Sequence, residues 1–175
     1  MATGTILLPI NGAIPSDGSA SNAAPEIIRV KGSAAAPAPH FVEARFDPST
    51  DEHLHWSFRM PTNYASGLVA KIQWKANSAT AGHTVVWAVK VSAVTEADAD
   101  TPNEHALATE NSGSEDVNTT EARRLIETSI TLTNADSVAA GDWVVIQLRR
   151  DPDNASDDCT VDAELVGFSL EYTTS

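Results

Sequence analysis

The chain is poor in cysteine, since Cys159 is the only one in 175 residues. A single thiol cannot close a disulfide within the chain, which excludes the small secreted scaffolds that depend on such bridges. Asp157 and Asp158 directly precede it, and their negative charge disfavours the thiolate that a nucleophile needs. We therefore expect Cys159 to be a structural, unreactive residue. At this length one domain can bury a sufficient core without disulfide or metal crosslinks.

Basic residues are scarce as well. The chain has 11 Lys and Arg against 24 Asp and Glu, which gives a formal net charge of −13. A surface this negative repels phosphate backbones and anionic lipid headgroups, so we expect neither a nucleic-acid partner nor a membrane partner. The same charge favours docking on a basic protein surface.

Long hydrophobic runs are also missing. No stretch approaches the roughly 20 apolar residues that a membrane-spanning helix needs. The apolar run at residues 6–10 has no basic leader and is too short for the hydrophobic region of a signal peptide. The sequence therefore predicts a protein that is made and kept in a cytoplasm, or released from it by lysis.

Helical periodicity is nearly absent, and a two-residue alternation takes its place. Apolar side chains occupy every second position in residues 54–60, 68–74 and 85–91, as in strands with one face in a core and the other in water. Further strand patterns lie at residues 26–31, 41–46, 125–133, 143–150 and 160–172. The apolar parity of the last run changes near residues 165–167, which predicts a β-bulge.

These patterns predict an all-β protein with a jelly-roll-like β-sandwich of about eight antiparallel strands. The alternative is an immunoglobulin-like sandwich, but a Cys…Trp…Cys pattern is absent. The order of the strands is not written in their periodicity.

The tryptophans divide into two groups by parity. Trp56, Trp74 and Trp87 lie on the apolar side of their strands, which predicts the packed centre of the sandwich. Trp143 opens its strand on the more polar parity. It is the aromatic side chain that could face a ligand such as a sugar, and the alternative is an edge tryptophan that plugs the core.

The first 40 residues are rich in Pro, Ala and Gly. They predict an extended N-terminal arm at residues 1–40, followed by the β-sandwich domain at 41–175. Such an arm is either disordered or ordered against a partner, and its apolar cluster favours the partner. The expected partner-binding residues are Ile6, Leu7, Leu8, Ile10 and Ile14. Residues 96–121 contain eight acids and no Lys or Arg, so we expect a solvated loop there.

Recognisable catalytic and metal-binding motifs are absent. Nucleophile elbows, phosphate-binding glycine loops and His-Glu-x-x-His are not found. His53 and His55 share one side of a strand, but no third ligand follows at zinc spacing, so solvent-facing histidines are expected. The acids of residues 151–158 resemble a calcium loop only in part, because Ser156 and Asp162 stand where its glycine and glutamate should be.

Carboxylates within strands are the remaining candidates for catalysis. Glu43, Glu127 and Glu164 lie within predicted strands, and solvated strand faces are the expected setting. A catalytic acid instead needs surroundings that raise its pKa. We therefore expect no enzymatic activity and no cofactor or metal. Two alternatives stay open, which are hydrolysis of sugars by two carboxylates and a calcium ion at the rim of the sandwich.

Several motifs resemble those of known proteins. Residues 56–67 have the spacing W-x-F-x-x-P-x-x-Y-x-x-G, residues 74–76 read W-x-A, and Arg150-Asp151 leads toward the final strand. In this respect the chain is similar to the all-β virion structural proteins of tailed bacteriophages. The resemblance covers roughly residues 54–90 and 149–172.

The resemblance implies a virion component, most simply a capsid decoration protein that stabilises the head through its N-terminal arm and subunit contacts. It further implies a homo-oligomer, with a trimer favoured, and the major capsid protein or other virion proteins as partners. The alternative function is a carbohydrate-binding module or a tail or fibre domain that recognises the host.

Overall fold

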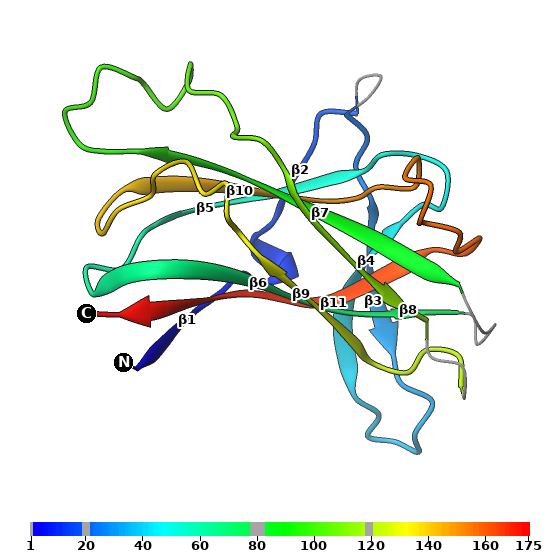
Figure 1. Ribbon diagram of the computed structural model, residues 1–175. Coiled ribbons are helices and arrows are strands. Elements are labelled where there is room, and N and C mark those ends of the chain that lie inside the picture. The colour runs from blue at the N-terminus through cyan, green and yellow to red at the C-terminus, as the bar shows by residue number, and fades with distance from the viewer. Residues whose placement is uncertain (1, 19–21, 78–82, 118–120) are drawn as a thin grey trace.

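Two antiparallel β-sheets pack face to face in the computed structural model of the chain (Figure 1). The structure describes residues 2–18, 22–77, 83–117 and 121–175. Within these residues the elements are β1 (Thr3–Leu7), the 3-10 helix η1 (Ile10–Gly12), β2 (Ile14–Pro15), β3 (Glu26–Lys31), β4 (His40–Phe46), β5 (His53–Arg59), β6 (Tyr64–Ala76), β7 (Thr84–Val94), β8 (Asn111–Asp116), β9 (Ile126–Thr131), β10 (Trp143–Arg150) and β11 (Ala163–Thr174). No helix in the described ranges has the length and apolarity of a membrane span.

The strand order is that of a jelly roll. One sheet has the order β3-β4-β11-β6-β9, with β1 added to β11, and the other has the order β2-β5-β10-β7-β8. The eight strands β4 to β11 thus form the two four-stranded layers of a double Greek key, 4-11-6-9 and 5-10-7-8. The sequence-based prediction of a jelly-roll-like β-sandwich is confirmed.

The core consists of the side chains on the apolar parity of the strands. Trp74 and Trp87 are fully buried, and Trp56 is 3% exposed. The rings of Phe46 and Trp87 lie 5.0 Å apart in an edge-on arrangement, and those of Trp74 and Trp87 lie 6.1 Å apart. The three tryptophans are therefore the packed centre that parity predicted.

The bulge predicted in the last strand is present in β11. Its pairing with β6 shifts register between Leu165 and Gly167. A Cβ atom on Gly167 would lie 2.8 Å from the Gln73 side-chain oxygen, so glycine leaves room for the Gln73 side chain in its present position. The irregularity moves the apolar parity by one residue and keeps Phe168 and Leu170 in the core.

The start of the chain differs from the expected extended arm, because β1 and β2 belong to the sheets of their own chain. β1 pairs with residues 169–173 of β11, while β4 pairs only with residues 163–165 of the same strand. The long β11 would otherwise leave an open edge, which β1 covers. β2 likewise pairs with β5, and β3 pairs with β4.

The five residues expected to bind a partner accordingly have different surroundings. Leu8 and Ile10 are buried in the core, and Ile6 packs partly against it. The Trp56 indole N–H also donates to the Pro9 carbonyl at 2.9 Å. Leu7 and Ile14 are 76% and 57% exposed. Partner binding stays a prediction, and these two side chains are the accessible ones.

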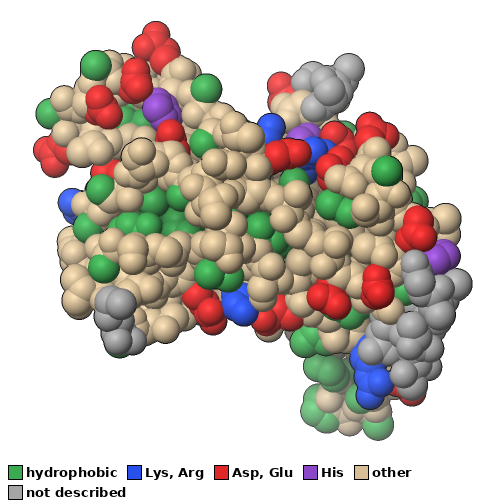
Figure 2. Space-filling view, in the orientation of Figure 1, with side chains coloured by type: hydrophobic (Ala, Val, Ile, Leu, Met, Phe, Trp, Pro, Cys, Tyr) green, Lys and Arg blue, Asp and Glu red, His purple; other side chains and the backbone are tan. Residues whose placement is uncertain are grey.

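The acidic segment is also more regular than expected. Its residues 111–116 form β8, which pairs antiparallel with β7 along the whole of its length. Asn111 is buried, and its side chain hydrogen-bonds to the Val89 and Asn134 carbonyls. The preceding part, residues 95–110, is a loop without strands that runs along the upper left of Figure 1, where Figure 2 shows several acidic side chains.

Two buried tryptophans provide a matched prediction about stability. The Trp74 indole N–H donates to the Thr128 hydroxyl at 2.9 Å, and Thr128 is 1% exposed. The Trp87 indole N–H has no acceptor among the described residues. Trp74→Phe would leave a buried hydroxyl without its donor, whereas Trp87→Phe would remove a group that is already unpaired. We expect Trp74→Phe to lower the free energy of unfolding by about 1–2 kcal/mol more than Trp87→Phe. Urea unfolding of both variants measures the difference, and equal losses would contradict this account.

Candidate functional site

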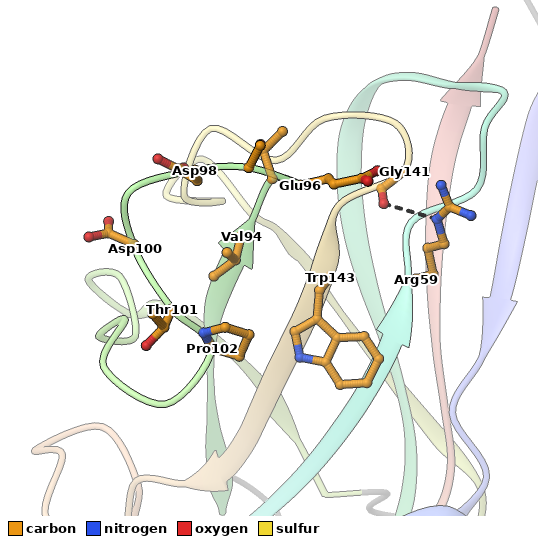
Figure 3. A pocket seen from close by; sticks show the side chains of 11 residues that line it. Arg59, Val94, Glu96, Asp98, Asp100, Thr101, Pro102, Gly141 and Trp143 are labelled. Carbon is orange, nitrogen blue, oxygen red and sulfur yellow. Dashed lines mark hydrogen bonds between the residues drawn. The ribbon is translucent and has the colours of Figure 1, made fainter.

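A hollow of about 590 Å³ lies at the end of the sheet formed by β5, β10 and β7. Strand register places Trp143 of β10 opposite Arg59 of β5 on one side and opposite Val94 of β7 on the other. The loop that follows β7 forms the remaining wall with residues 95–102. Figure 3 shows the indole of Trp143 between this loop and Arg59.

The floor of the hollow is apolar. Trp143 is 43% exposed, and the side chains of Val94 and Pro102 lie on the loop side of its ring (Figure 3). The polar parity of Trp143 therefore turns it outward, as needed for a ligand-facing aromatic. It does not plug the core, which was the alternative.

Two charged groups border this floor. The Arg59 Nε donates to the Gly141 carbonyl at 3.1 Å, which fixes the guanidinium beside the hollow. Glu96 is exposed, and its side chain extends toward Gly141 (Figure 3). Asp98 and Asp100 also line the hollow, but their carboxylates point away from Trp143 in the same view. The charged residues that line the hollow are thus Arg59, Glu96, Asp98 and Asp100.

A buried aspartate holds the elements of the hollow together. Asp142 is 3% exposed, and its carboxylate accepts hydrogen bonds from the Thr95 hydroxyl at 2.9 Å and from the Ala139 N–H at 2.7 Å. Its own carbonyl accepts the Met60 N–H at 2.8 Å. These bonds join the end of β7, the approach to β10 and the end of β5, so the strand ends around Trp143 are held together.

A histidine ties the loop to a neighbouring turn. The ring nitrogens of His105 contact Asp100 at 3.0 Å and Asp136 at 2.6 Å. The Asp136 carboxylate also accepts the Ala93 N–H at 2.7 Å. The hydrogen bond to Asp136 raises the pKa of His105 above its ordinary value, against the opposing effect of partial burial, and Asp100 raises it further.

The histidine pair considered as the start of a zinc site has other contacts. His53 is 8% exposed, and a ring nitrogen of His55 lies 2.9 Å from the Gln147 amide nitrogen. Burial lowers the pKa of both histidines, which favours their neutral form. The expectation of solvent-facing side chains was wrong for His53. Across the described ranges, no group of three or more His, Cys, Asp or Glu is placed to hold a metal ion.

Two of the three strand carboxylates are buried, in contrast to the expected solvated faces. Glu43 and Glu164 are 0% and 4% exposed. Both form ion pairs with Lys75, and the Lys75–Glu43 distance is 2.6 Å. Arg45 pairs with Glu43 at 3.0 Å as well. Glu127 is more exposed and pairs with Lys71. The structure thus gives each of these carboxylates a lysine or arginine as its partner.

The oxygens of the calcium-like segment are largely occupied by protein donors. Asp151 pairs with Arg149, and Asp157 pairs with Arg150. Asp158 accepts the Thr84 N–H at 2.6 Å. Cys159 beside them is buried, and burial raises the pKa of its thiol, in agreement with the expected structural role.

Sequence reasoning found Trp143 and missed the residues around it. Arg59 and Val94 adjoin Trp143 only through the register of three strands. Glu96 and Pro102 come from the loop that was expected to be merely solvated. In the sequence, Arg59 lies on the outward parity of its strand, but this position does not indicate which residues lie beside it.

Comparison with known proteins gives similarity of fold. No protein-family model matches the chain, and no curated protein matches it. Solved structures with a similar fold include a family 35 carbohydrate-binding module from Clostridium thermocellum, at 8% identity and a TM-score of 0.45, covering 95% of this chain and 97% of that one. A family 11 module from the same organism, in complex with a β-1,3-1,4-mixed-linked tetrasaccharide, has 10% identity and a TM-score of 0.44, with 97% and 96% covered.

A third similar structure is the module TmCBM61 in complex with β-1,4-galactotriose, at 12% identity and a TM-score of 0.42, covering 91% of this chain and 86% of that one. At these identities and TM-scores the similarity concerns the fold alone. The β-sandwich fold that the resemblance to phage virion proteins implied is confirmed. The similar structures named above give no support to a phage origin.

Proposed function

We propose that the chain binds carbohydrate in the hollow around Trp143. The observation that carries the proposal is an indole that is 43% exposed on an apolar floor and bordered by one carboxylate and one guanidinium. Ligand pockets typically combine apolar lining with a few polar groups that orient the ligand. A sugar ring has the matching chemistry, with C–H groups on its faces and hydroxyls around its edge.

Neutral sugars fit the hollow best. The C–H face of a pyranose can lie on the indole, whose π-face attracts the slightly positive hydrogens. Glu96 would accept hydrogen bonds from ring hydroxyls, and the terminal nitrogens of Arg59 would donate them. With the carboxylates of Glu96, Asp98 and Asp100 against one guanidinium in its lining, the hollow disfavours anionic ligands, and its apolar floor suits a neutral sugar.

The other function raised by the sequence, a virion decoration protein, keeps the status of a prediction. Its partners, the major capsid protein and further copies of this chain in a trimer, are equally untested. Leu7 and Ile14 are the candidates whose side chains could reach such a partner. No feature of the Trp143 hollow favours this role.

The proposed function predicts a large effect for Trp143→Ala. Loss of the stacking platform should weaken glycan binding by about tenfold or more, since aromatic contacts and buried area each contribute about a kcal/mol. Affinity electrophoresis in gels that contain β-1,3-1,4-glucan, β-1,4-galactan, xylan or galactomannan measures the retardation. Retardation by at least one polysaccharide, lost in the variant, is the expected result.

The exposed Phe41, 39% accessible and outside this hollow, supplies the matched control. Phe41→Ala should leave retardation unchanged. Binding that survives Trp143→Ala, or wild-type protein that no polysaccharide retards, would overturn the assignment.

A further inference from the structure

The loop at residues 95–110 forms one wall of the Trp143 hollow, and its last residue, Glu110, is hydrogen-bonded to Arg149 of β10. It contributes Glu96, Thr101 and Pro102 to the lining. Near its end, the Ala108 N–H donates to the Val91 carbonyl at 2.8 Å. Between the Thr95 and Ala108 attachments, the contacts of His105 with Asp100 and Asp136 brace the loop.

The geometry of His105 requires a particular protonation state. A carboxylate oxygen lies 3.0 Å from Nδ1 and another lies 2.6 Å from Nε2. A carboxylate only accepts hydrogen bonds, so both ring nitrogens must carry a proton. The neutral ring has one N–H and one lone pair, and its lone pair would face a negative oxygen. The arrangement therefore corresponds to an imidazolium.

Asp136 is a rigid anchor for this contact. Its backbone has a φ of 55°, in the left-handed region, and its carboxylate is held by the Ala93 N–H at 2.7 Å. Asp100 comes from the loop itself, between the lining residues Asp98 and Thr101. The imidazolium thus connects the wall of the hollow to the turn before β10.

We propose that His105 is a positioning residue that, in its imidazolium form, holds the 95–110 loop beside Trp143 and makes glycan affinity decrease as pH rises. The inference rests on the proposed function for the same hollow. The protein must fix the loop before the glycan can use it, so apparent affinity scales with the fraction of molecules in which the loop is fixed.

The direction of the pH dependence follows from the contacts. Asp136 and Asp100 raise the pKa of His105, so its charged form is favoured in the folded protein. The stabilisation is complete below the ordinary histidine value of about 6.5 and is lost as pH rises through the raised value. Glu104, on the same loop, is hydrogen-bonded to the Thr101 hydroxyl rather than to His105.

Two variants and one control test the proposal. His105→Gln removes the charge, and Asp136→Asn removes the anchoring charge while asparagine tolerates the left-handed backbone and keeps an acceptor for Ala93. His40→Gln changes an exposed histidine outside the hollow. Hydrogen exchange of amides 96–107, corrected for intrinsic rates, and retardation by the four polysaccharides are both measured at about pH 6 and about pH 9.5.

In the wild-type protein and His40→Gln, we expect faster exchange of the loop and roughly threefold to tenfold weaker retardation at the higher pH. His105→Gln and Asp136→Asn should both show the fast loop exchange and the weaker retardation at about pH 6 as well as at about pH 9.5. Equal loop exchange in the wild type at the two pH values, or a pH dependence that survives His105→Gln, would overturn the proposal. If a variant does not fold, an NMR titration of His105 in the wild-type protein tests the proposal instead. A pKa at or below the ordinary histidine value would contradict the role proposed for His105.

The readouts also separate this inference from the proposed function. Wild-type protein that no polysaccharide retards refutes glycan binding and with it the effect of His105 on affinity. If polysaccharide retards the protein but neither the affinity nor the loop exchange depends on pH, only the role proposed for His105 is refuted.

Discussion

Replacing Asp157 with alanine should lower the free energy of unfolding by about 3–5 kcal/mol, a typical cost for breaking a buried ion pair from one side. Arg150 is fully buried, and the Asp157 side chain is 1% exposed. The two carboxylate oxygens accept hydrogen bonds from Arg150 at 3.0 and 2.7 Å, and one of them also accepts the Val86 N–H at 2.9 Å. The variant would leave a buried guanidinium without the carboxylate that it directly pairs with.

Carbonyl groups cannot compensate for this loss. Arg150 also donates to the Val161 carbonyl at 2.8 Å and to the Phe46 carbonyl at 3.4 Å, but a carbonyl carries no net charge. Chemical denaturation monitored by tryptophan fluorescence gives the free energy. Asp153→Ala is the matched control, because Asp153 is exposed in the same segment, and it should change stability by no more than about 0.5 kcal/mol. Similar values for the two variants would show that the buried pair is not needed.

Leu8→Ala should lower the free energy of unfolding by about 2–5 kcal/mol, as for other buried leucines. Leu8 is 3% exposed and belongs to the core, together with Ile10 and Trp56. Its backbone N–H donates to the Phe168 carbonyl at 2.9 Å, which extends the pairing of β1 with β11. Truncation therefore removes a part of the sandwich interior.

The neighbouring residue provides an internal control. Leu7 is 76% exposed, and Leu7→Ala should change stability by no more than about 0.5 kcal/mol. A thermal or chemical unfolding series compares the same substitution at adjacent positions. If Leu8→Ala is as mild as Leu7→Ala, the N-terminal segment is dispensable for the core. Because Leu7→Ala is expected to leave the fold stable, this variant can also be used to test partner binding.

The sequence and the structure agree most closely where local periodicity controls the outcome. Alternation along β5, β6 and β7 predicted the side chains that form the core, because a strand turns successive residues to opposite faces. In β7 the other face is buried as well, since Val86 and Ala88 are 3% and 1% exposed, and alternation did not predict this. The slip of parity in β11 predicted its bulge for the same reason. Parity also singled out Trp143 as the aromatic that could face a ligand, with a core plug as the alternative, and its exposure of 43% decides between the two.

The errors arose where contacts depend on residues distant in the chain. The proline-rich start was expected to be an arm, but the exposed edge of β11, some 160 residues later, gives β1 its partner. Glu43 and Glu164 were expected in solvent, but neighbouring strands bring Lys75 between them and allow their burial.

By itself, then, the sequence determined the class of the fold and the apolar face of each strand, since these follow from local sterics and a two-residue period. Only the tertiary structure decided the jelly-roll order, the docking of β1, the exposure of Trp143 and its meeting with Arg59 and Glu96 around one hollow. Strand pairing joins segments by backbone hydrogen bonds that every residue except proline can donate. Side chains that meet across strands therefore leave no mark at a fixed spacing in the sequence.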